Sequence, residues 1–209
     1  GEMSMQQTDI VRIIRDNTLS LQRLIEDLLS YQQHKRATQI KVEAVEMQQV
    51  IERVVREHRL EMLSRVISVD IRGDAPMLLG DREQLRVVLD NLLSNAIKYT
   101  PRGGKVRIIS TLDGAMAQID IEDDGPGVAL EEQDRVFESF YRGNASTNGK
   151  IKGSGLGLAI VREYVLAHHG HVFVVEPGKP GGHFRVRLPL DLTRSEGPPT
   201  VMQGDSIAV

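Results

Sequence analysis

Residues 91–99 read Asn-Leu-Leu-Ser-Asn-Ala-Ile-Lys-Tyr, and this stretch decides how the middle of the chain folds. Its apolar residues recur every three or four positions, which predicts an amphipathic helix. Two carboxamide oxygens one turn apart on such a helix can ligate a hard cation such as Mg²⁺, and a lysine beside them can add charge near phosphates. An ordinary polar helix face is the alternative. The residues that share this face are Asn91, Asn95, Lys98 and Tyr99.

Two glycine-rich segments follow this helix. Residues 123–127, Asp-Asp-Gly-Pro-Gly, come directly after a predicted strand, so that Asp123 can accept a hydrogen bond from an exocyclic amine such as that of adenine; a plain turn is the alternative. Residues 153–158, Gly-Ser-Gly-Leu-Gly-Leu, open a predicted helix and present consecutive N–H groups to an anion. This segment does not match the dinucleotide pattern Gly-x-Gly-x-x-Gly. Residues 143–150 are not a phosphate loop either, because Ile151 replaces the required Ser or Thr.

The hydrophobic pattern of the rest predicts strands gathered around three helices. Asp113-Gly114, between two apolar runs, is the strongest hairpin signal in the chain. Asp81, with Gln84 three residues later, is a suitable N-cap for the second helix. Because strands and helices do not alternate regularly, the pattern favours an α+β fold, a two-layer sandwich with helices on one face of a mixed sheet. Strands are expected at about 40–44, 66–71, 77–79, 106–112, 115–122, 172–175 and 184–188, and helices at 47–62, 81–99 and 156–168.

Residues 8–35 carry a heptad pattern that predicts a long amphipathic helix. A lone helix of this length exposes too much apolar surface to be stable in water, so it needs a partner. Either it packs on its own domain or it joins an intermolecular bundle, and its sustained stripe and terminal position favour the bundle. The stripe consists of Ile10, Ile14, Leu21, Leu24, Leu28 and Tyr31, with polar Asn17 among them.

The composition of the 209-residue chain limits the classes of protein to which it can belong. With 40% apolar residues, it can bury a sizeable core in one domain plus an appendage. A net charge of −3 gives no reason to expect nucleic-acid binding, and the absence of cysteine excludes disulfides and thiolate metal sites. No apolar run reaches the roughly 20 residues of a membrane helix, and residues 1–7 do not form a signal peptide. The abrupt polar start suggests a piece of a longer protein.

Four ordered segments together resemble the nucleotide-binding boxes of bacterial two-component sensor histidine kinases. Residues 91–99 look like the N box, 123–127 the G1 box, 137–142 (Phe-Glu-Ser-Phe-Tyr-Arg) the F box and 153–158 the G2 box. The resemblance covers about residues 46–189. It implies a member of the GHKL superfamily, whose ATP binds in a Bergerat-type pocket under a mobile lid. It also implies a kinase that donates the γ-phosphoryl group of ATP to a histidine, for onward transfer to a response regulator aspartate.

The resemblance assigns roles around the base and the metal. Asp123 would bind the adenine amine, and Tyr99 would pack against the base. Asn91 and Asn95 would hold Mg²⁺ and phosphate, with Lys98 near the phosphates. The expected cofactors are therefore ATP and Mg²⁺.

The resemblance also assigns the catalytic residues and the lid. Arg142 would approach the γ-phosphate, where charge develops as the phosphoryl group leaves, and with Lys98 it is the expected catalytic residue. Residues 143–152 would form the lid, because small and polar residues between glycines pack poorly. Lys150 and Lys152 would hold the triphosphate, or would simply be solvated. Besides those already named, the expected nucleotide-binding residues are Gly125, Gly127, Val128, Gly143, Gly153, Ser154, Gly155, Leu156, Gly157 and Leu158.

The N-terminal helix resembles the second helix of the family's dimerisation hairpin, through residues 24–29. Residues 1–36 are therefore expected to be this helix, 37–192 the ATP-binding catalytic domain and 193–209 a disordered tail. None of the six histidines lies in a run like the family's phosphoacceptor segment, His-Glu-Leu-Arg-Thr-Pro. The chain is thus expected to bind Mg-ATP without autophosphorylating, with the acceptor upstream in a parent protein.

The resemblance implies partners and a location as well. The full-length protein would be a homodimer through a four-helix bundle and would contact a response regulator receiver domain, with residues around 15–26 involved. This part would be cytoplasmic, with no membrane segment of its own, and the parent would lie in the bacterial inner membrane.

Other interpretations are weighed against this one. A GHKL ATPase of the gyrase or mismatch-repair type carries a glutamate general base where Asn91 stands, and an asparagine cannot take a proton from water. Anti-sigma-factor serine kinases share the fold, but the heptad helix argues against them. A non-catalytic dimerisation module is disfavoured by the intact Asn95, Asp123 and glycines. His168, His169 and His171 are expected to carry partial positive charge that complements a helix dipole, with a metal site as the weaker alternative.

Overall fold

The computed structural model describes residues 40–143 and 153–192, together with residues 10, 11, 14, 15 and 18. Those last five residues are helical, and the Thr18 hydroxyl donates to the Ile14 carbonyl oxygen at 2.9 Å, in agreement with the helix expected there. The rest of that expected helix and the expected tail 193–209 lie outside the described residues. Within the described part, no helix is both long and apolar enough to cross a bilayer.

Five strands form a mixed sheet in the order β2-β4-β5-β7-β6. β2 runs parallel to β4, and the other neighbouring pairs are antiparallel. The β4–β5 hairpin turns at Gly114, whose φ of +60° suits a glycine, so the predicted hairpin is confirmed. The strands are β2 (Ser68–Arg72), β4 (Lys105–Asp113), β5 (Met116–Asp123), β6 (His171–Val174) and β7 (Gly182–Pro189).

A second, two-stranded sheet pairs β1 (Glu43–Glu46) with β3 (Met77–Gly80) in antiparallel register. The strand expected at 40–44 therefore begins three residues later than predicted. Val45 is fully buried in the core, whereas Val42 is 53% exposed. The bounds predicted from the alternation of residues 40–44 were wrong, because the burial of Val45 determines which face of the strand points toward the core.

Within residues 40–143 and 153–192, four α-helices accompany the strands: α2 (Met47–Glu57), α3 (Arg59–Arg65), α4 (Arg82–Tyr99) and α6 (Gly157–Ala167). The single helix expected at 47–62 is divided at His58, whose ring lies 2.8 Å from Asp90 Oδ1 on α4. This hydrogen bond raises the pKa of His58 and lowers that of Asp90. The N-cap prediction is confirmed, since Asp81 Oδ1 accepts from the backbone N–H groups of Glu83 and Gln84 at 3.1 Å.

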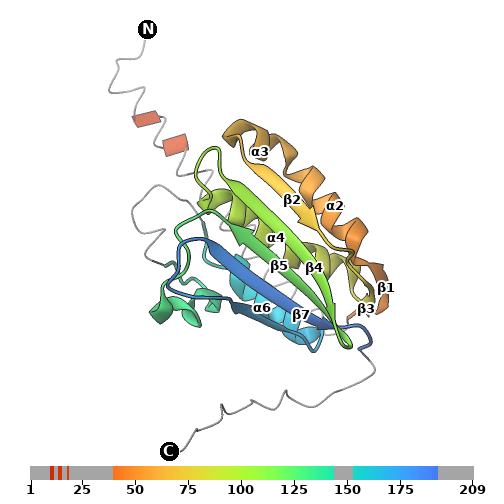
Figure 1. Cartoon of the computed structure of the whole chain (residues 1–209). Helices are drawn as coiled ribbons and strands as arrows, with labels where there is room; N and C mark the ends of the chain where they lie inside the picture. Colours follow the sequence, from red (N-terminus) through yellow and green to blue (C-terminus); the bar gives the residue numbers. More distant parts are fainter. Residues whose placement is uncertain (1–9, 12–13, 16–17, 19–39, 144–152, 193–209) are drawn as a thin grey trace, which may run out of the picture.

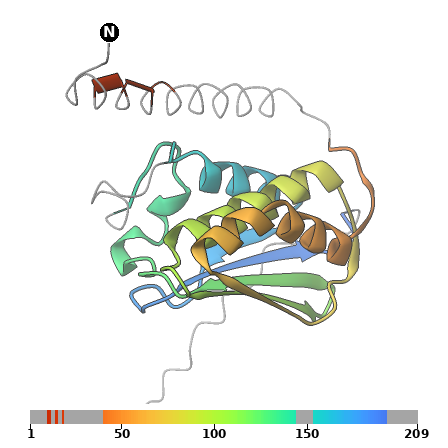
Figure 2. The same ribbon diagram turned by 90° about the horizontal axis from the view of Figure 1, so that it is seen from above.

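The helices cover one face of the five-stranded sheet and leave the other face open (Figures 1 and 2). The predicted two-layer α+β sandwich is therefore confirmed. Its core lies between the layers, where the largest fully buried side chains from α2, α4, β5, β7 and the start of α6 include Ile51, Leu92, Leu93, Ile97, Ile119, Ile121, Leu156 and Leu188.

The open face of the sheet carries charged side chains that pair across strands. Asp120 on β5 is only 3% exposed, although it points away from the core. Its Oδ1 lies 2.6 Å from both His183 Nε2 and Arg185 Nε on β7, and its Oδ2 accepts from Gln118 at 2.9 Å. Burial opposes ionisation of Asp120, but these hydrogen bonds outweigh it and the pKa is lowered. We call Asp120, His183 and Arg185 the Asp120 cluster.

His168, at the end of α6, differs from its expected role. It is only 1% exposed, and burial lowers its pKa, so it is neutral rather than partly cationic. Its Nε2 accepts from the backbone N–H of Asp81 at 2.9 Å, and its Nδ1 faces the Tyr164 carbonyl oxygen at 2.7 Å. The histidine therefore joins the end of α6 to the start of α4, which is a role in packing and not in complementing a dipole.

Candidate functional site

The polar face of α4 lies at the edge of the core, and Asn91, Asn95, Lys98 and Tyr99 are all half-buried there. Asn91 Nδ2 donates to the Val87 carbonyl oxygen at 2.9 Å, which fixes the carboxamide and leaves its oxygen turned away from that bond. A Cβ on Gly157 would lie only 2.6 Å from Asn91 Oδ1. The N box and the G2 box are therefore in contact, and the missing side chain of Gly157 makes this approach possible.

Asp123 stands at the carboxyl end of β5, as predicted, and is 6% exposed. Its Oδ1 accepts from the backbone N–H groups of Gly125 at 2.7 Å and Gly182 at 3.3 Å. Burial raises the pKa of this carboxyl, and the two backbone hydrogen bonds oppose that shift only in part. The carboxylate is thus held in one orientation by the backbone, with Oδ2 in the direction of Gly182.

The turn after Asp123 packs against a loop that the sequence pattern did not assign to the site, the β6–β7 loop of residues 175–181. Gly181 N–H donates to the Gly125 carbonyl oxygen at 2.9 Å, and Gly178 N–H donates to Val128 at 2.7 Å. Gly127 has a φ of +79°, and a Cβ there would lie 2.1 Å from the Lys179 carbonyl oxygen. In the sequence, the glycines of residues 178–182 were the only indication that this loop could approach the main chain of the site.

The F box and the G2 box meet at Gly155. The Phe140 N–H donates to the Gly155 carbonyl oxygen at 2.9 Å, and a Cβ on Gly155, whose φ is +76°, would lie 2.8 Å from Phe140 C. Leu156, which follows, is 1% exposed and anchors the start of α6 in the core. Ser154 Oγ accepts from the Leu156 N–H at 3.3 Å. The first turn of α6 is thus fixed beside the residues that precede Arg142.

The structure therefore brings the four predicted segments together. The N-box helix α4 contacts the G2 box through Asn91. It contacts the G1 turn through the Tyr99 carbonyl oxygen, since a Cβ on Gly125 would lie 3.1 Å from that oxygen. Arg142 is exposed and Gly143 is half-buried at the end of the described F box. Lys150 and Lys152, and with them most of the expected lid, lie outside the described residues.

The donor set at Asn91 is compatible with a hard cation. Its carboxamide oxygen is oriented by the Nδ2 hydrogen bond, and Mg²⁺ prefers oxygen ligands with waters and phosphates completing its shell. Asn95 lies one turn further along the same face of α4. Among the described residues, no group of three or more His, Cys, Asp or Glu side chains could hold a metal, so the alternative metal site at His168 finds no support there.

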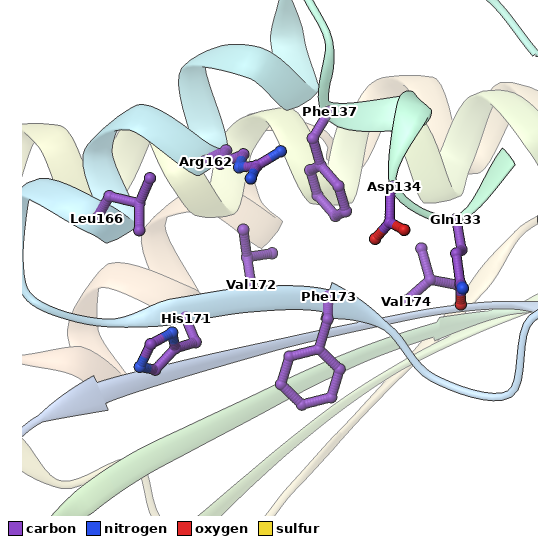
Figure 3. A pocket seen from close by; sticks show the side chains of 9 residues that line it. All are labelled: Gln133, Asp134, Phe137, Arg162, Leu166, His171, Val172, Phe173 and Val174. Carbon is purple, nitrogen blue, oxygen red and sulfur yellow. The ribbon is translucent and has the colours of Figure 1, made fainter. Parts of the chain in front are cut away.

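A separate hollow of about 170 Å³ lies between α6, β6 and the short 3₁₀ helix η2 (Arg135–Phe137). Figure 3 shows Phe137 and Arg162 approaching it from above β6, where Val172 points toward α6. Of its lining residues only Phe137 belongs to one of the four boxes, and none is among the expected nucleotide-binding residues. It is therefore distinct from the place where the four boxes meet.

Known proteins resemble this chain in sequence and in fold. The family described as "Histidine kinase-, DNA gyrase B-, and HSP90-like ATPase" matches residues 80–192. Sensor histidine kinase GlrK of Escherichia coli (strain K12) is 33% identical over 189 residues, which cover 90% of this chain and 40% of GlrK. Full-length ShkA in complex with AMPPNP is 26% identical, with a TM-score of 0.72 over 90% of this chain and 40% of ShkA. Histidine kinase ThkA in complex with response regulator TrrA shares the fold at 18% identity, with a TM-score of 0.73 over 93% and 54% of the respective chains.

The residues matched by the family include α4, Asp123, the G1 turn, the F box and α6, which are the elements that converge in the structure. The chain spans 40% of the length of GlrK. GlrK and the similar QseE of Escherichia coli O157:H7 are named sensor histidine kinases, which favours this type over the gyrase type and the serine kinases considered above. The chain thus belongs to the histidine kinase-, DNA gyrase B- and HSP90-like ATPase family, as a catalytic domain of the bacterial two-component sensor histidine kinase type.

Proposed function

We propose that this chain binds Mg-ATP at the junction of the four boxes and presents the γ-phosphoryl group to a histidine elsewhere in a parent kinase. The observation that carries the proposal is Asp123, a buried carboxylate whose Oδ1 is held by two backbone N–H groups. A carboxylate fixed in this way is a preorganised acceptor for the exocyclic amine of adenine. Gly125 and Gly127 allow the turn after Asp123 to pack closely against Tyr99 and Lys179, which fixes the backbone beside this carboxylate. Tyr99 packs against the base.

The triphosphate is placed between α4 and the start of α6. The N-cap residue of α6 is Leu156, whose side chain cannot accept a hydrogen bond from the first N–H groups of the helix. These N–H groups therefore favour an anion at the N-terminus of α6. Asn91 and Asn95 hold Mg²⁺, which supplies charge neutralisation of the phosphates when bound. Lys98 adds positive charge on the same face of α4, and Arg142 approaches the γ-phosphate, where negative charge increases as the bond to the leaving group breaks.

The acceptor and the partners belong to the parent protein. No histidine of this chain lies in an acceptor-like segment, so the phosphoryl group goes to a histidine outside it and then to an aspartate of a receiver domain. The solved complex of ThkA with TrrA is that of a protein of the same fold with its response regulator. We infer a homodimer through a four-helix bundle, to which the N-terminal helix contributes, in a parent at the bacterial inner membrane.

A titration with nucleotide tests the base assignment. Mg-ATP and Mg-ADP are titrated into the wild type, Asp123→Asn and the control Asp113→Asn by calorimetry. Asp113 is a suitable control because its exposed carboxylate pairs with Arg187 at 2.6 Å, at the opposite end of the β4–β5 hairpin from Asp123. We expect Asp123→Asn to weaken both nucleotides by at least about tenfold, as for a charge-assisted hydrogen bond, and the control to change neither. Unchanged affinity in Asp123→Asn contradicts the proposal.

A labelling experiment tests whether this chain only presents the γ-phosphoryl group and does not accept it. Incubation of this chain with γ-labelled ATP is expected to leave no label on the protein, because the acceptor is absent. Stable label on this chain contradicts that expectation.

A further inference from the structure

Glu132 is a buried carboxylate outside the four boxes. It ends the short 3₁₀ helix η1 (Leu130–Glu132) and is only 6% exposed. The Tyr141 hydroxyl donates to its Oε1 at 3.0 Å. The backbone of Gly143 lies against the same carboxylate, since a Cβ there would be 3.0 Å from Glu132 Oε2. One carboxylate therefore contacts the residues on both sides of Arg142.

Two further contacts hold the same segment. The guanidinium carbon of Arg135 lies 4.5 Å from the centroid of the Tyr141 ring, a cation–π arrangement. Phe140 has a φ of +66°, which is uncommon for a residue with a side chain, and it is kept there by the hydrogen bond to Gly155. The backbone that leads into Arg142 is thus held at Phe140 by the G2 box and at Tyr141 by Glu132, which also lies against Gly143 on the other side of Arg142.

We propose that Glu132 and Tyr141 are positioning residues, which hold the Arg142 backbone so that its guanidinium meets the γ-phosphate of bound ATP. This inference rests on the proposed function. Burying a carboxylate is costly unless it is hydrogen-bonded, and the Tyr141 hydroxyl contributes a bond to that carboxylate rather than apolar packing. An arginine on an exposed loop loses side-chain and backbone entropy when it engages a ligand, and a backbone that is already fixed reduces this cost.

The readout is the ratio of the affinities for Mg-ATP and Mg-ADP, because only ATP carries the γ-phosphate. Tyr141→Phe keeps the ring over Arg135 and removes only the hydroxyl, and Glu132→Gln keeps the shape and removes the charge. Glu83→Gln, an exposed carboxylate paired with Arg86 on α4, is the matched control. Arg142→Ala sets the ratio in the absence of the guanidinium. The melting temperature of each variant is measured alongside.

We expect Tyr141→Phe and Glu132→Gln each to lower the ATP-to-ADP ratio by about three- to tenfold, toward the ratio of Arg142→Ala, with affinity for ADP retained within about twofold. The double variant Tyr141→Phe/Arg142→Ala should have the same ratio as Arg142→Ala, since the anchor acts through the arginine. Glu83→Gln should match the wild type.

Three results overturn the inference. The first is an unchanged ratio in folded Tyr141→Phe. The second is a double variant with a further loss of the ratio, which would mean that Tyr141 acts independently of Arg142. The third is an Arg142→Ala variant that keeps the wild-type ratio, which would leave no γ-phosphate contact to position. In each case the Asp123→Asn titration decides separately whether the nucleotide site itself is as proposed, and should Glu132→Gln fail to fold, Tyr141→Phe alone decides.

Discussion

Protonation of His168 should separate α6 from α4 and destabilise the fold below neutral pH. The ring nitrogen Nε2 accepts from the Asp81 N–H, and Nδ1 must therefore carry the hydrogen that it donates to the Tyr164 carbonyl oxygen. A second proton would place an N–H directly opposite the N–H of Asp81. Because burial lowers the pKa of His168 in the folded chain, the unfolded chain binds this proton first.

The sign and size of the effect follow from linkage. A histidine whose folded pKa is depressed contributes its full stability above its unfolded pKa of about 6.5 and loses it as the pH falls toward the folded pKa. Each pH unit in that window removes at most about 1.4 kcal/mol, so the loss between pH 6.5 and pH 5 is at most ~2 kcal/mol. His168→Ala adds a cavity and leaves the Asp81 N–H without its acceptor, for a cost of about 4 kcal/mol at pH 7.5.

Urea denaturation of the wild type and His168→Gln at pH 7.5 and pH 5 isolates the histidine. Glutamine does not titrate, so the contributions of other groups, such as His58 and Asp123, cancel in the difference between the two proteins. We expect the stability advantage of the wild type to shrink by 1 to 2 kcal/mol, an estimate of about one pH unit of linkage, at the lower pH. A constant advantage, or one that grows as the pH falls, would refute the assignment of a neutral, buried His168.

Three further outcomes are expected. Affinity for Mg-ATP should fall on acidification at a higher pH than the usual carboxyl range, because the pKa of Asp123 is raised and the protonated form loses its acceptor charge. Calorimetry across pH 4.5 to 8 checks this as a fall in the wild type beyond that in Asp123→Asn, since the γ-phosphate of ATP titrates with both proteins. Gly157→Ala should displace the Asn91 carboxamide, 2.6 Å from the new Cβ, and reduce the Mg²⁺-dependent part of ATP affinity several-fold in titrations with and without the metal. Gly127→Ala should lower the free energy of unfolding, measured by urea denaturation, by about 3 kcal/mol, because its Cβ would meet a backbone carbonyl oxygen 2.1 Å away. Gly114→Ala should lower it by only about 1 kcal/mol, because no atom lies within 4 Å and only the positive φ is unfavourable. Equal losses would contradict the packing of the G1 turn.

Most elements could be predicted because their signals are local. The 18 residues of α4 show a clear helical period and begin at a capping aspartate, and the β4–β5 hairpin is marked by Asp113-Gly114. The adjacency of the four boxes followed from their resemblance to a known family and not from periodicity. Their contact through Gly157 and Gly155 shows why glycine is needed at these positions.

The features that could not be predicted depend on tertiary contacts. The division between α2 and α3 comes with the bond from His58 to Asp90, 32 positions away in the sequence. The neutral state of His168 depends on the Asp81 N–H, which lies 87 positions away. The β6–β7 loop enters the site only because β7 pairs with β5, and no periodic pattern in its own sequence indicates that neighbour.

The contact of Asp123 with Gly182 has a consequence for how β5 and β7 can align. Alternation of apolar and polar residues forbids a shift of one residue between these strands, but it permits a shift of two. In the observed register Asp120 is opposite Arg185, and Asp123 is opposite Gly182. A shift of two would still leave Asp120 opposite a basic side chain, His183 or Arg187, so the Asp120 cluster alone tolerates it. The same shift would bring opposite Asp123 either Pro180, which has no N–H, or Phe184, whose Cβ would take the place where a Cβ on Gly182 would lie 2.2 Å from Asp123 Oδ2. Gly182 thereby selects the one alignment in which the backbone can hold the Asp123 carboxylate, the proposed adenine acceptor.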